Sequence, residues 1–251
     1  MSEPRVHLVL VPGWGHDSQI WQDVAAHLPV DWQLHYLEWP GCNDETDSSS
    51  RWELPSMLEH LIKQVAAKAV WCGWSLGGQL ATLVAHRFPE QVSGLITLCS
   101  NPRFVVDNDW PCAMPKSIFQ AFVDSAKQQP EQTLRRFRQL AVKGAATARA
   151  DFRRLQAFGQ SWTADGLVAG LTCLQNWDMR TLLPQLAMPQ VHLLSTADAL
   201  VPPESGAHLA ELAADIDVQE LEGAGHTPML SHPLWLADWL VNLISRKWAE
   251  C

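Results

Sequence analysis

Ser75 stands between an apolar segment and a second segment with helical periodicity, in the sequence VWCGWSLGGQLA. Gly73 lies two residues before it and Gly77 two residues after it, which gives the pattern G-x-S-x-G. We predict a strand over 69–73 and a helix from about 76 to 87. A turn between such elements can lift a serine hydroxyl above a sheet edge, with glycines where side chains would collide. The pattern therefore predicts a nucleophilic serine, with a structural turn serine as the alternative.

A nucleophilic serine needs a base within hydrogen-bonding reach, and that base needs a carboxylate to orient it. For a serine on this kind of turn, the acid and then the histidine follow later in the chain, after later strands. Asp198 follows a predicted strand in VHLLSTADALVP, and His226 follows the next one in VQELEGAGHTPML. We predict that both act with Ser75. The alternatives are a turn aspartate and a loop histidine. His232 is interpreted as a helix cap, and the remaining histidines lie on helices, in strands or early in the chain.

The same chemistry requires two backbone N–H groups that stabilise the negative oxygen of the tetrahedral intermediate. One belongs to the residue after the nucleophile, which is Leu76. The other is expected from the loop VPGWGHD after the first predicted strand. Pro12 has no N–H and Gly13 lets the backbone turn closely, so Trp14 is the predicted second donor.

Predicted strands alternate with predicted helices along most of the chain, and these elements must bring the three side chains together. The predicted strands span 5–11, 32–39, 69–73, 92–100, 190–195 and 216–223. The predicted helices span about 21–28, 54–65, 76–87, 204–214 and a C-terminal segment that carries Leu236, Trp239, Leu240 and Leu243 on one face. This alternation predicts an α/β protein with a mostly parallel, doubly wound sheet and helices on both faces.

One segment interrupts the alternation. Residues 109–182 hold helix formers and several arginines with almost no strand signal, so we expect a helical lid inserted into the core. The predicted organisation is a first core part over 1–108, the lid over 109–182 and a second core part over 183–251.

The composition excludes several classes of protein. The chain has 251 residues and a formal net charge of -9, which argues against general nucleic-acid binding. Since no run of about 18 apolar residues and no signal-peptide pattern occur, we expect neither a membrane span nor secretion. The six cysteines are scattered without metal-ligand spacing, so we expect reduced thiols in a cytoplasmic protein and no metal site.

Four segments match a known superfamily in order. LVLVPGWG, GWSLGG, STADALVP and GAGHTPMLSHP resemble the oxyanion, nucleophile, acid and histidine segments of the α/β-hydrolase superfamily, which implies the α/β-hydrolase fold. More narrowly, the tryptophans in PGWG and GWSLGG, and the segments SNPRFVVDNDWP and TLRRFRQLAVKGAATARADFRRLQ, resemble the pimeloyl-[acyl-carrier protein] methyl ester esterases of biotin biosynthesis. This resemblance implies a serine carboxylesterase that needs no cofactor, frees the pimeloyl carboxylate and methanol, and has an acyl-carrier protein as its partner.

The resemblance also implies which residues meet the substrate and the carrier. The implied substrate contacts are Trp14, Ser75, Leu76, Phe137, Arg138, Gln139, Leu140, Ala141 and His226. The implied carrier-docking residues are Arg136, Arg149 and Arg153. Gln132 stands where a further arginine is expected, and Arg135 or Arg138 could take its place.

The distribution of charge independently favours an acidic partner. Residues 131–154 hold seven basic and two acidic side chains, whereas the whole chain carries a net charge of -9. Arg149 and Arg153 are four residues apart, which places them on one face of a helix. A local basic patch can steer a strongly acidic carrier protein. The alternative is a solvated helix face with ordinary surface arginines.

Other functions stay open at this point. The predicted triad also suits a general short-chain carboxylesterase or a C–C bond hydrolase, and the motifs do not separate these activities. A non-catalytic ligand-binding protein of the same fold is a third alternative, whereas a haloalkane dehalogenase would need a carboxylate where Ser75 stands. We expect a monomer, with neither nucleic acid nor membrane as a partner.

Overall fold

The computed structural model describes residues 6–40, 42, 52–65, 67–158 and 162–248. Its centre is one sheet of six parallel strands in the order β2-β1-β3-β4-β5-β6. The strands are β1 (Val6–Val11), β2 (Trp32–Tyr36), β3 (Ala69–Trp74), β4 (Val92–Leu98), β5 (Gln190–Ser195) and β6 (Ile216–Leu221). All residues of β3, β4 and β5 are buried, as expected for parallel strands that are covered on both faces.

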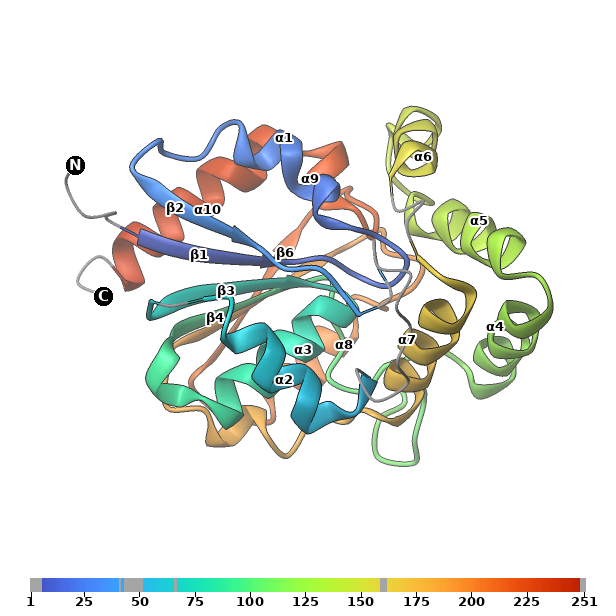
Figure 1. Ribbon diagram of the computed structural model, residues 1–251, viewed down its shortest axis with the longest axis horizontal. Helices are drawn as coiled ribbons and strands as arrows, with labels where there is room; N and C mark the ends of the chain where they lie inside the picture. Colours follow the sequence, from blue (N-terminus) through green and yellow to red (C-terminus); the bar gives the residue numbers. More distant parts are fainter. Residues whose placement is uncertain (1–5, 41, 43–51, 66, 159–161, 249–251) are drawn as a thin grey trace.

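Helices cover both faces of this sheet. The α-helices of the core are α1 (Gln22–Ala25), α2 (Leu54–Ile62), α3 (Leu76–Arg87), α8 (Ser205–Ala210), α9 (Pro228–Ser231) and α10 (Pro233–Lys247). Short 3-10 turns are η1 (Ser18–Trp21), η3 (Pro89–Gln91) and η4 (Leu183–Gln185). α1 and α10 lie on one face, whereas α2 and α3 lie on the other (Figure 1). α8 packs against β6.

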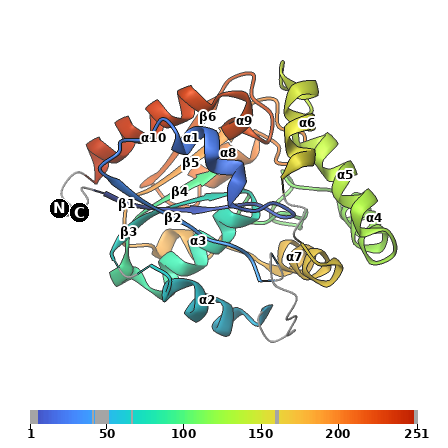
Figure 2. The ribbon, with the colours of Figure 1, turned by 45° about the horizontal axis from the view of Figure 1, so that its top comes forward.

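Four further helices lie between β4 and β5 in the chain, and we refer to them as the lid helices. They are α4 (Lys116–Gln128), α5 (Pro130–Ala141), α6 (Ala148–Ala157) and α7 (Ala164–Asn176). Figures 1 and 2 show them beyond the end of the sheet at which the strands finish, with α7 next to the core. α7 contacts α3, and α6 contacts α9. Loops at the carboxyl ends of parallel strands form ligand sites in α/β folds, so the lid helices stand over the expected site.

The predicted α/β fold with a parallel sheet is confirmed, and the differences lie at the ends of elements. β2 ends at Tyr36 rather than at residue 39, because Trp39 turns inward and its Nε1–H donates to the Pro12 carbonyl at 2.8 Å. The predicted helix at 21–28 is the shorter pair η1 and α1, which ends at Ala25. The division of the chain at residues 109 and 182 stays a prediction.

Two further predictions concern the start of the first strand and the absence of a membrane span. Residue 5 of the first predicted strand lies outside the described residues. Within the described ranges, no helix combines the length and the apolar character that a membrane crossing demands.

Candidate active site

Ser75 occupies a strained turn between β3 and α3. Its φ of 55° and ψ of -121° are unusual for a residue other than glycine, and conformations of this kind cost about 1–3 kcal/mol. A Cβ atom at Gly73 would lie 2.2 Å from the Gly77 carbonyl oxygen, and one at Gly77 would lie 2.4 Å from the Val11 carbonyl oxygen. The Ser75 N–H donates to the Leu98 carbonyl of β4 at 2.9 Å. The glycines therefore permit the turn, and the neighbouring strand holds it.

The structure brings the three predicted catalytic side chains together. His226 Nε2 lies 2.9 Å from Ser75 Oγ, and His226 Nδ1 lies 2.7 Å from Asp198 Oδ2. Asp198 Oδ1 accepts the N–H groups of Leu200 and Val201 at 2.8 and 3.0 Å. Because the carboxylate accepts the Nδ1 proton, Nε2 is free to accept a proton from the serine hydroxyl. This arrangement can generate a serine nucleophile.

Contacts from the lid hold the loops that carry the acid and the base. The His226 N–H donates to the Ala141 carbonyl at the end of α5, at 3.0 Å, and the Trp74 indole donates to the His226 carbonyl at 2.7 Å. Gly144 has a φ of 95°, and a Cβ atom there would lie 2.3 Å from the Ala197 carbonyl oxygen. The turn after α5 therefore packs directly against the residue before Asp198 and binds the backbone of His226. Sequence reasoning did not find these contacts.

The two predicted oxyanion donors belong to segments next to the serine. Leu76 is the first residue of α3, where N–H groups have no partner within the helix and the helix dipole favours negative charge. The loop after β1 passes close by, since a Cβ atom at Gly13 would lie 3.1 Å from Ser75 Cβ. The Trp14 N–H forms no hydrogen bond to another described residue, and the Trp14 ring packs edge-on against Phe137 at 4.9 Å. Their role as donors stays a prediction.

His16 lies in the same loop, early in the chain, and the sequence gives it no predicted role. It is fully buried, its Nδ1–H donates to the Trp14 carbonyl at 2.9 Å, and its backbone N–H donates to the Gly13 carbonyl at 3.3 Å. Burial, followed by the positive charge of Arg138, lowers the pKa of His16 to about 3. A neutral imidazole therefore fixes the turn that carries Trp14. A histidine directly after PGWG was the available sequence signal.

His232, the alternative histidine, stands at the predicted helix start, away from the triad. It occupies the N-cap position of α10, but its side chain makes no capping hydrogen bond to the helix. Its Nδ1 instead lies 2.8 Å from the hydroxyl of Ser231. The predicted cap position of His232 is therefore confirmed, although its side chain makes no capping hydrogen bond.

A cavity of about 630 Å³ lies between the lid helices α5, α6 and α7. It is lined by Glu131, Gln132, Leu134, Arg135, Arg138, Gln156, Trp162 and Leu167. Ser75 and His226 are not among these lining residues. Leu167 connects the cavity to the loop after β1, because its carbonyl accepts the Trp14 indole N–H at 2.8 Å. Apolar side chains and charged side chains share the wall, which suits a chain-like ligand with polar groups.

The five predicted substrate contacts on α5 do not all face the site. Phe137 and Ala141 are buried, and the Phe137 ring meets the His226 ring edge-on at 6.3 Å. Arg138 is buried and lines the cavity. Gln139 is exposed and Leu140 is half-buried. The structure therefore brings three of the five toward the interior, and Gln139 lies on the solvent side of the helix.

The predicted carrier-docking arginines are all exposed. Arg136 lies on α5, where its guanidinium stands over the Phe122 ring at 5.3 Å, and Arg149 and Arg153 lie on α6. Gln132 and Arg135 are exposed as well. We refer to Arg136, Arg149 and Arg153 as the lid arginines.

Arg138 cannot replace the arginine that is missing at Gln132. Its guanidinium donates to the Phe158 carbonyl at 2.5 Å and to the Gly15 carbonyl at 3.4 Å. Burial lowers the pKa of Arg138 to about 10, while the negative charge of Asp17 acts in the opposite direction. Arg138 therefore joins the lid to the loop after β1 instead of facing a partner, and only Arg135 is left as the substitute.

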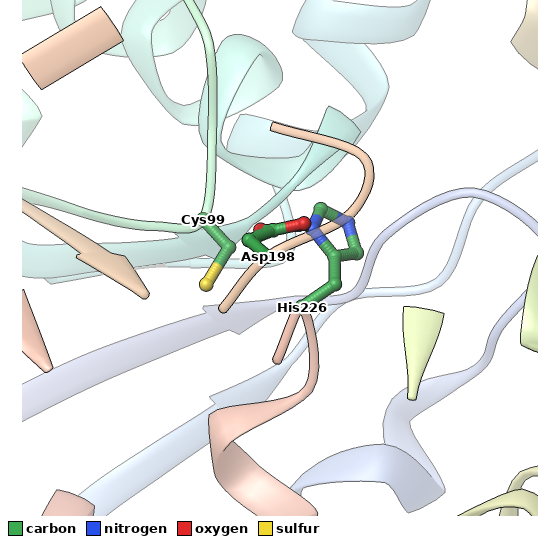
Figure 3. Close-up of side chains that lie close together, drawn as sticks. All are labelled: Cys99, Asp198 and His226. Carbon is green, nitrogen blue, oxygen red and sulfur yellow. Dashed lines mark hydrogen bonds and ion pairs between the residues drawn. The ribbon is translucent and has the colours of Figure 1, made fainter. Parts of the chain in front are cut away.

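Three neighbouring side chains are of residue types that can bind metal ions. Cys99, Asp198 and His226 each offer an atom within 4.8 Å of the other two, and all three are buried (Figure 3). Zinc accepts such sulfur, oxygen and nitrogen ligands. However, His226 and Asp198 are already hydrogen-bonded to each other, and burial raises the pKa of the Cys99 thiol well above its usual value. Asp198 and His226 therefore form a hydrogen-bonded pair, and Cys99 lies beside this pair as a neutral thiol.

Known proteins share both the sequence and the fold. The chain is 36% identical over 234 residues to "Pimeloyl-[acyl-carrier protein] methyl ester esterase" of Sodalis glossinidius, covering 90% of this chain and 89% of the relative. It is 32% identical over 249 residues to the protein of that name from Klebsiella pneumoniae, covering 98% and 96%. An esterase from Exiguobacterium antarcticum superposes with a TM-score of 0.85 at 19% identity, over 95% of this chain and 91% of that chain.

A bromoperoxidase from Bacillus anthracis has the same fold, with a TM-score of 0.84 at 16% identity over 95% of this chain and 91% of that one. At such low identity, the two solved structures establish the fold alone. The model of the "Alpha/beta hydrolase family" matches residues 8–239. The chain therefore belongs to the alpha/beta hydrolase family.

Proposed function

We propose that this protein is a serine carboxylesterase that hydrolyses the methyl ester of pimeloyl-[acyl-carrier protein] in biotin biosynthesis. The observation that carries the proposal is the position of the His226 imidazole, 2.9 Å from Ser75 Oγ and 2.7 Å from Asp198 Oδ2. The choice of substrate is supported by the two relatives that bear this name and match nearly the full chain at 32–36% identity.

The first half of the reaction forms an acyl-enzyme. Ser75 Oγ attacks the carbonyl carbon of the methyl ester while His226 Nε2 takes the hydroxyl proton. Asp198 holds the imidazole through Nδ1 and stabilises the imidazolium that forms. The N–H groups of Leu76 and Trp14 bind the negative oxygen, and each such donor contributes about 3–4 kcal/mol to transition-state stabilisation. The intermediate then collapses, and His226 protonates the departing methoxy group as methanol.

The second half frees the acid. A water molecule gives a proton to His226 Nε2 and attacks the ester carbonyl of the acylated Ser75. The oxygen of Ser75 leaves with the proton that His226 held, and the pimeloyl carboxylate is released. The same three side chains therefore serve both half-reactions, and none of these steps involves a cofactor.

The carrier protein is proposed to dock on the lid arginines. Arg136, Arg149 and Arg153 are exposed on neighbouring helices, and residues 131–154 hold a surplus of positive charge within an acidic chain. An acidic carrier is attracted to such a surface. The cavity of about 630 Å³ between α5, α6 and α7 has charged residues and Trp162 in its wall, which suits an acyl chain joined to a polar arm. We propose that a monomer binds the carrier.

The proposed reaction takes place in the cytoplasm. The described cysteines Cys42, Cys72, Cys99, Cys112 and Cys173 carry free thiols, which suits a reducing compartment.

A side-by-side assay tests the proposal. The wild-type protein and the Ser75→Ala variant are given pimeloyl-[acyl-carrier protein] methyl ester and a short p-nitrophenyl ester. We expect the wild type to prefer the carrier-linked ester in kcat/KM, and Ser75→Ala to lose activity on both while its circular dichroism is unchanged. A fluorophosphonate probe should label the wild type only. Equal or greater kcat/KM on the short ester would favour a general carboxylesterase, and activity in Ser75→Ala would overturn the mechanism.

A further inference from the structure

The loop after β1, residues 12–16, accepts a hydrogen bond at each of its carbonyl groups, and we refer to it as the Trp14 loop. Two of these bonds lie within the loop, since His16 binds the Gly13 carbonyl through its N–H at 3.3 Å and the Trp14 carbonyl through Nδ1 at 2.9 Å. The other three donors are side chains from distant segments. They are Trp39 Nε1 on the Pro12 carbonyl at 2.8 Å, Arg138 on the Gly15 carbonyl at 3.4 Å and Trp162 Nε1 on the His16 carbonyl at 3.1 Å. The backbone of the loop is therefore fixed along its whole length.

The direction of the Trp14 N–H depends on this arrangement. The peptide group between Gly13 and Trp14 is trans and planar, so the Trp14 N–H points opposite to the Gly13 carbonyl. That carbonyl faces the His16 N–H, and a Cβ atom at Gly13 would lie 3.1 Å from Ser75 Cβ. The peptide group therefore passes beside the nucleophile with its own N–H turned away from His16. A rotation of this peptide group would break the bond to His16 and redirect the predicted oxyanion donor.

Trp162 holds the His16 end of the Trp14 loop from the lid. It is buried, and it lies between α6 and α7 in the chain. Its indole packs against that of Trp39, which holds the first residue of the loop, with ring centroids 6.3 Å apart. α7 adds a contact in the reverse sense, because the Trp14 indole donates to the Leu167 carbonyl at 2.8 Å. The two ends of the loop are therefore held by two indole groups that pack on each other.

Trp52 separates the role of an indole N–H from that of an aromatic ring. Its ring lies 6.0 Å from the Trp162 ring and is stacked on the Trp39 ring at 5.8 Å, so it belongs to the same cluster. Within the described residues, its Nε1 has no hydrogen-bond partner. Trp39 and Trp162, in contrast, each donate to the Trp14 loop. The cluster therefore contains a matched indole that contributes ring packing without a hydrogen bond to the loop.

We propose that Trp162 is a positioning residue for the oxyanion hole, whose indole N–H holds the His16 carbonyl and thereby the direction of the Trp14 N–H. The inference rests on the proposed esterase function, and it adds a lid residue that acts through the backbone of the Trp14 loop. Stabilisation of the negative oxygen then depends on the lid as well as on the core. Trp162, Arg138 and Leu167 also line the cavity between α5, α6 and α7. The same residues therefore border the cavity and hold residues 14–16, and a displaced lid would release the loop at these three positions.

Two substitutions at Trp162 separate its hydrogen bond from its ring. Trp162→Phe removes the indole N–H and keeps an aromatic ring, whereas Trp162→His keeps an N–H at nearly the same distance from Cβ and loses the larger ring. With p-nitrophenyl acetate, we expect Trp162→Phe to lower kcat about fivefold while KM stays within about twofold, because the weakened contact acts in the transition state. Trp162→His, measured at about pH 8 so that the imidazole is neutral, should retain more of kcat than Trp162→Phe. Trp52→Phe is the matched control and should leave kcat unchanged.

A transition-state analogue provides a readout that a packing defect would not change. Ser75 Oγ adds to the carbonyl carbon of a trifluoromethyl ketone, His226 takes the hydroxyl proton, and the ketone oxygen becomes negative, so the Ki reports on the oxyanion hole. In Trp162→Phe, the Ki should rise about fivefold, in step with the fall in kcat/KM, and in Trp52→Phe it should not change. Active sites are counted with a fluorophosphonate, so that misfolded protein does not lower the measured kcat.

Three outcomes would overturn the proposal. They are a kcat and Ki in Trp162→Phe equal to those of the wild type, a loss that appears in KM alone, and a larger loss of kcat in Trp162→His than in Trp162→Phe, which would follow ring size. Failure of the proposed function looks different, since it would appear as activity in Ser75→Ala or as a wild type that prefers the short ester to the carrier-linked one. If Ser75→Ala is inactive while Trp162→Phe matches the wild type, only the inference on Trp162 fails.

Discussion

The edge of the sheet that carries Ser75, Asp198 and His226 and the outer face of the lid helices differ in burial and in hydrogen bonding. At the edge, Ser75, Asp198 and His226 are buried, and each is held by backbone hydrogen bonds or strained turns. On the lid, Arg149 and Arg153 are exposed on α6, and the structure records no hydrogen bond or ion pair that fixes them. Within the described residues, the protein therefore combines a rigid reaction centre with an adaptable charged surface.

The difference follows from the task of each region, which is proton transfer at the sheet edge and attraction of a charged partner at the lid. Proton transfer needs atoms within hydrogen-bonding distance, so small displacements are costly at the edge. Attraction of a charged partner acts over about 8–10 Å at ordinary salt and tolerates mobile side chains. We therefore expect single changes at the edge to have large effects and changes on the lid to have small, salt-dependent effects.

The largest effect is expected from Asp198→Asn. The amide would present an N–H or a weaker acceptor to His226 Nδ1, which favours the wrong tautomer, and kcat should fall about 10⁴-fold. Asp217→Asn on β6 is the matched control, because Asp217 pairs with Lys247 at 3.0 Å on the surface. Hydrolysis of a p-nitrophenyl ester measures both variants. A loss below tenfold for Asp198→Asn would show that the buried acid does not set the orientation of the base.

Gly77→Ala should destabilise the fold by about 3 kcal/mol or more. The new Cβ would lie 2.4 Å from the Val11 carbonyl oxygen and 2.6 Å from the Pro12 carbonyl oxygen, and neither backbone can yield without moving β1. Gly206→Ala is the control, since its Cβ would meet only the side chains of Leu194 and Val218 at 3.0 and 3.3 Å. Urea denaturation compares the two. Equal stability would mean that the turn at Ser75 is less confined than the structure indicates.

His192 should make the core sensitive to acid. It is buried beside Thr97, and burial lowers its pKa to about 4. The unfolded chain takes up a proton at this residue below about pH 6.5 and the folded chain does not, so stability falls as the pH drops from about 6.5 to 4. The loss amounts to about 3 kcal/mol, at about 1.4 kcal/mol per pKa unit.

His192→Gln should flatten that part of the pH dependence, although His16, with its pKa of about 3, should keep part of the slope. Urea denaturation at pH 7, 5.5 and 4.5 measures the difference between the variant and the wild type. A parallel pH dependence in the two proteins would assign the acid sensitivity to other groups.

The smallest effect is expected on the lid. Arg149→Glu combined with Arg153→Glu should raise KM for the carrier-linked ester about tenfold at low salt and leave the p-nitrophenyl ester unchanged. The difference should shrink at 0.5 M salt. The double variant Arg87→Glu with Arg246→Glu changes the net charge equally on exposed residues of α3 and α10, and it should have little effect. Equal losses in both double variants would point to net charge instead of a docking surface.

The residues that meet at the triad were predictable because each one follows a strand within a short, recognisable segment. Ser75 lies in the pattern G-x-S-x-G, and Asp198 and His226 lie in the loops that follow β5 and β6. The supporting contacts were not predictable, because they join segments that are far apart in the chain. The Trp74 indole reaches the His226 carbonyl across 152 residues, and no local pattern specifies that contact.

The lid shows the same limit at the level of single helices. The helical character of 109–182 follows from composition, whereas the face that each helix buries depends on what lies beneath it. Arg138 illustrates this point, since a charged residue on an arginine-rich helix reads as exposed but is buried against Gly15 and Phe158. Gln139, its neighbour, faces solvent.

The His226 N–H donates to the Ala141 carbonyl, and Gly144 packs against Ala197. Because these contacts join the C-terminal end of α5 to the loops that carry the base and the acid, we expect this end of α5 to move least. A substrate that displaced the C-terminal end of α5 would also displace the loops that carry Asp198 and His226, and the triad would lose its geometry. Access should therefore come from the opposite end of α5, where Glu131 and Gln132 border the cavity. We therefore expect the C-terminal end of α5 to stay fixed, so that a long substrate can enter while Ser75, Asp198 and His226 keep their positions.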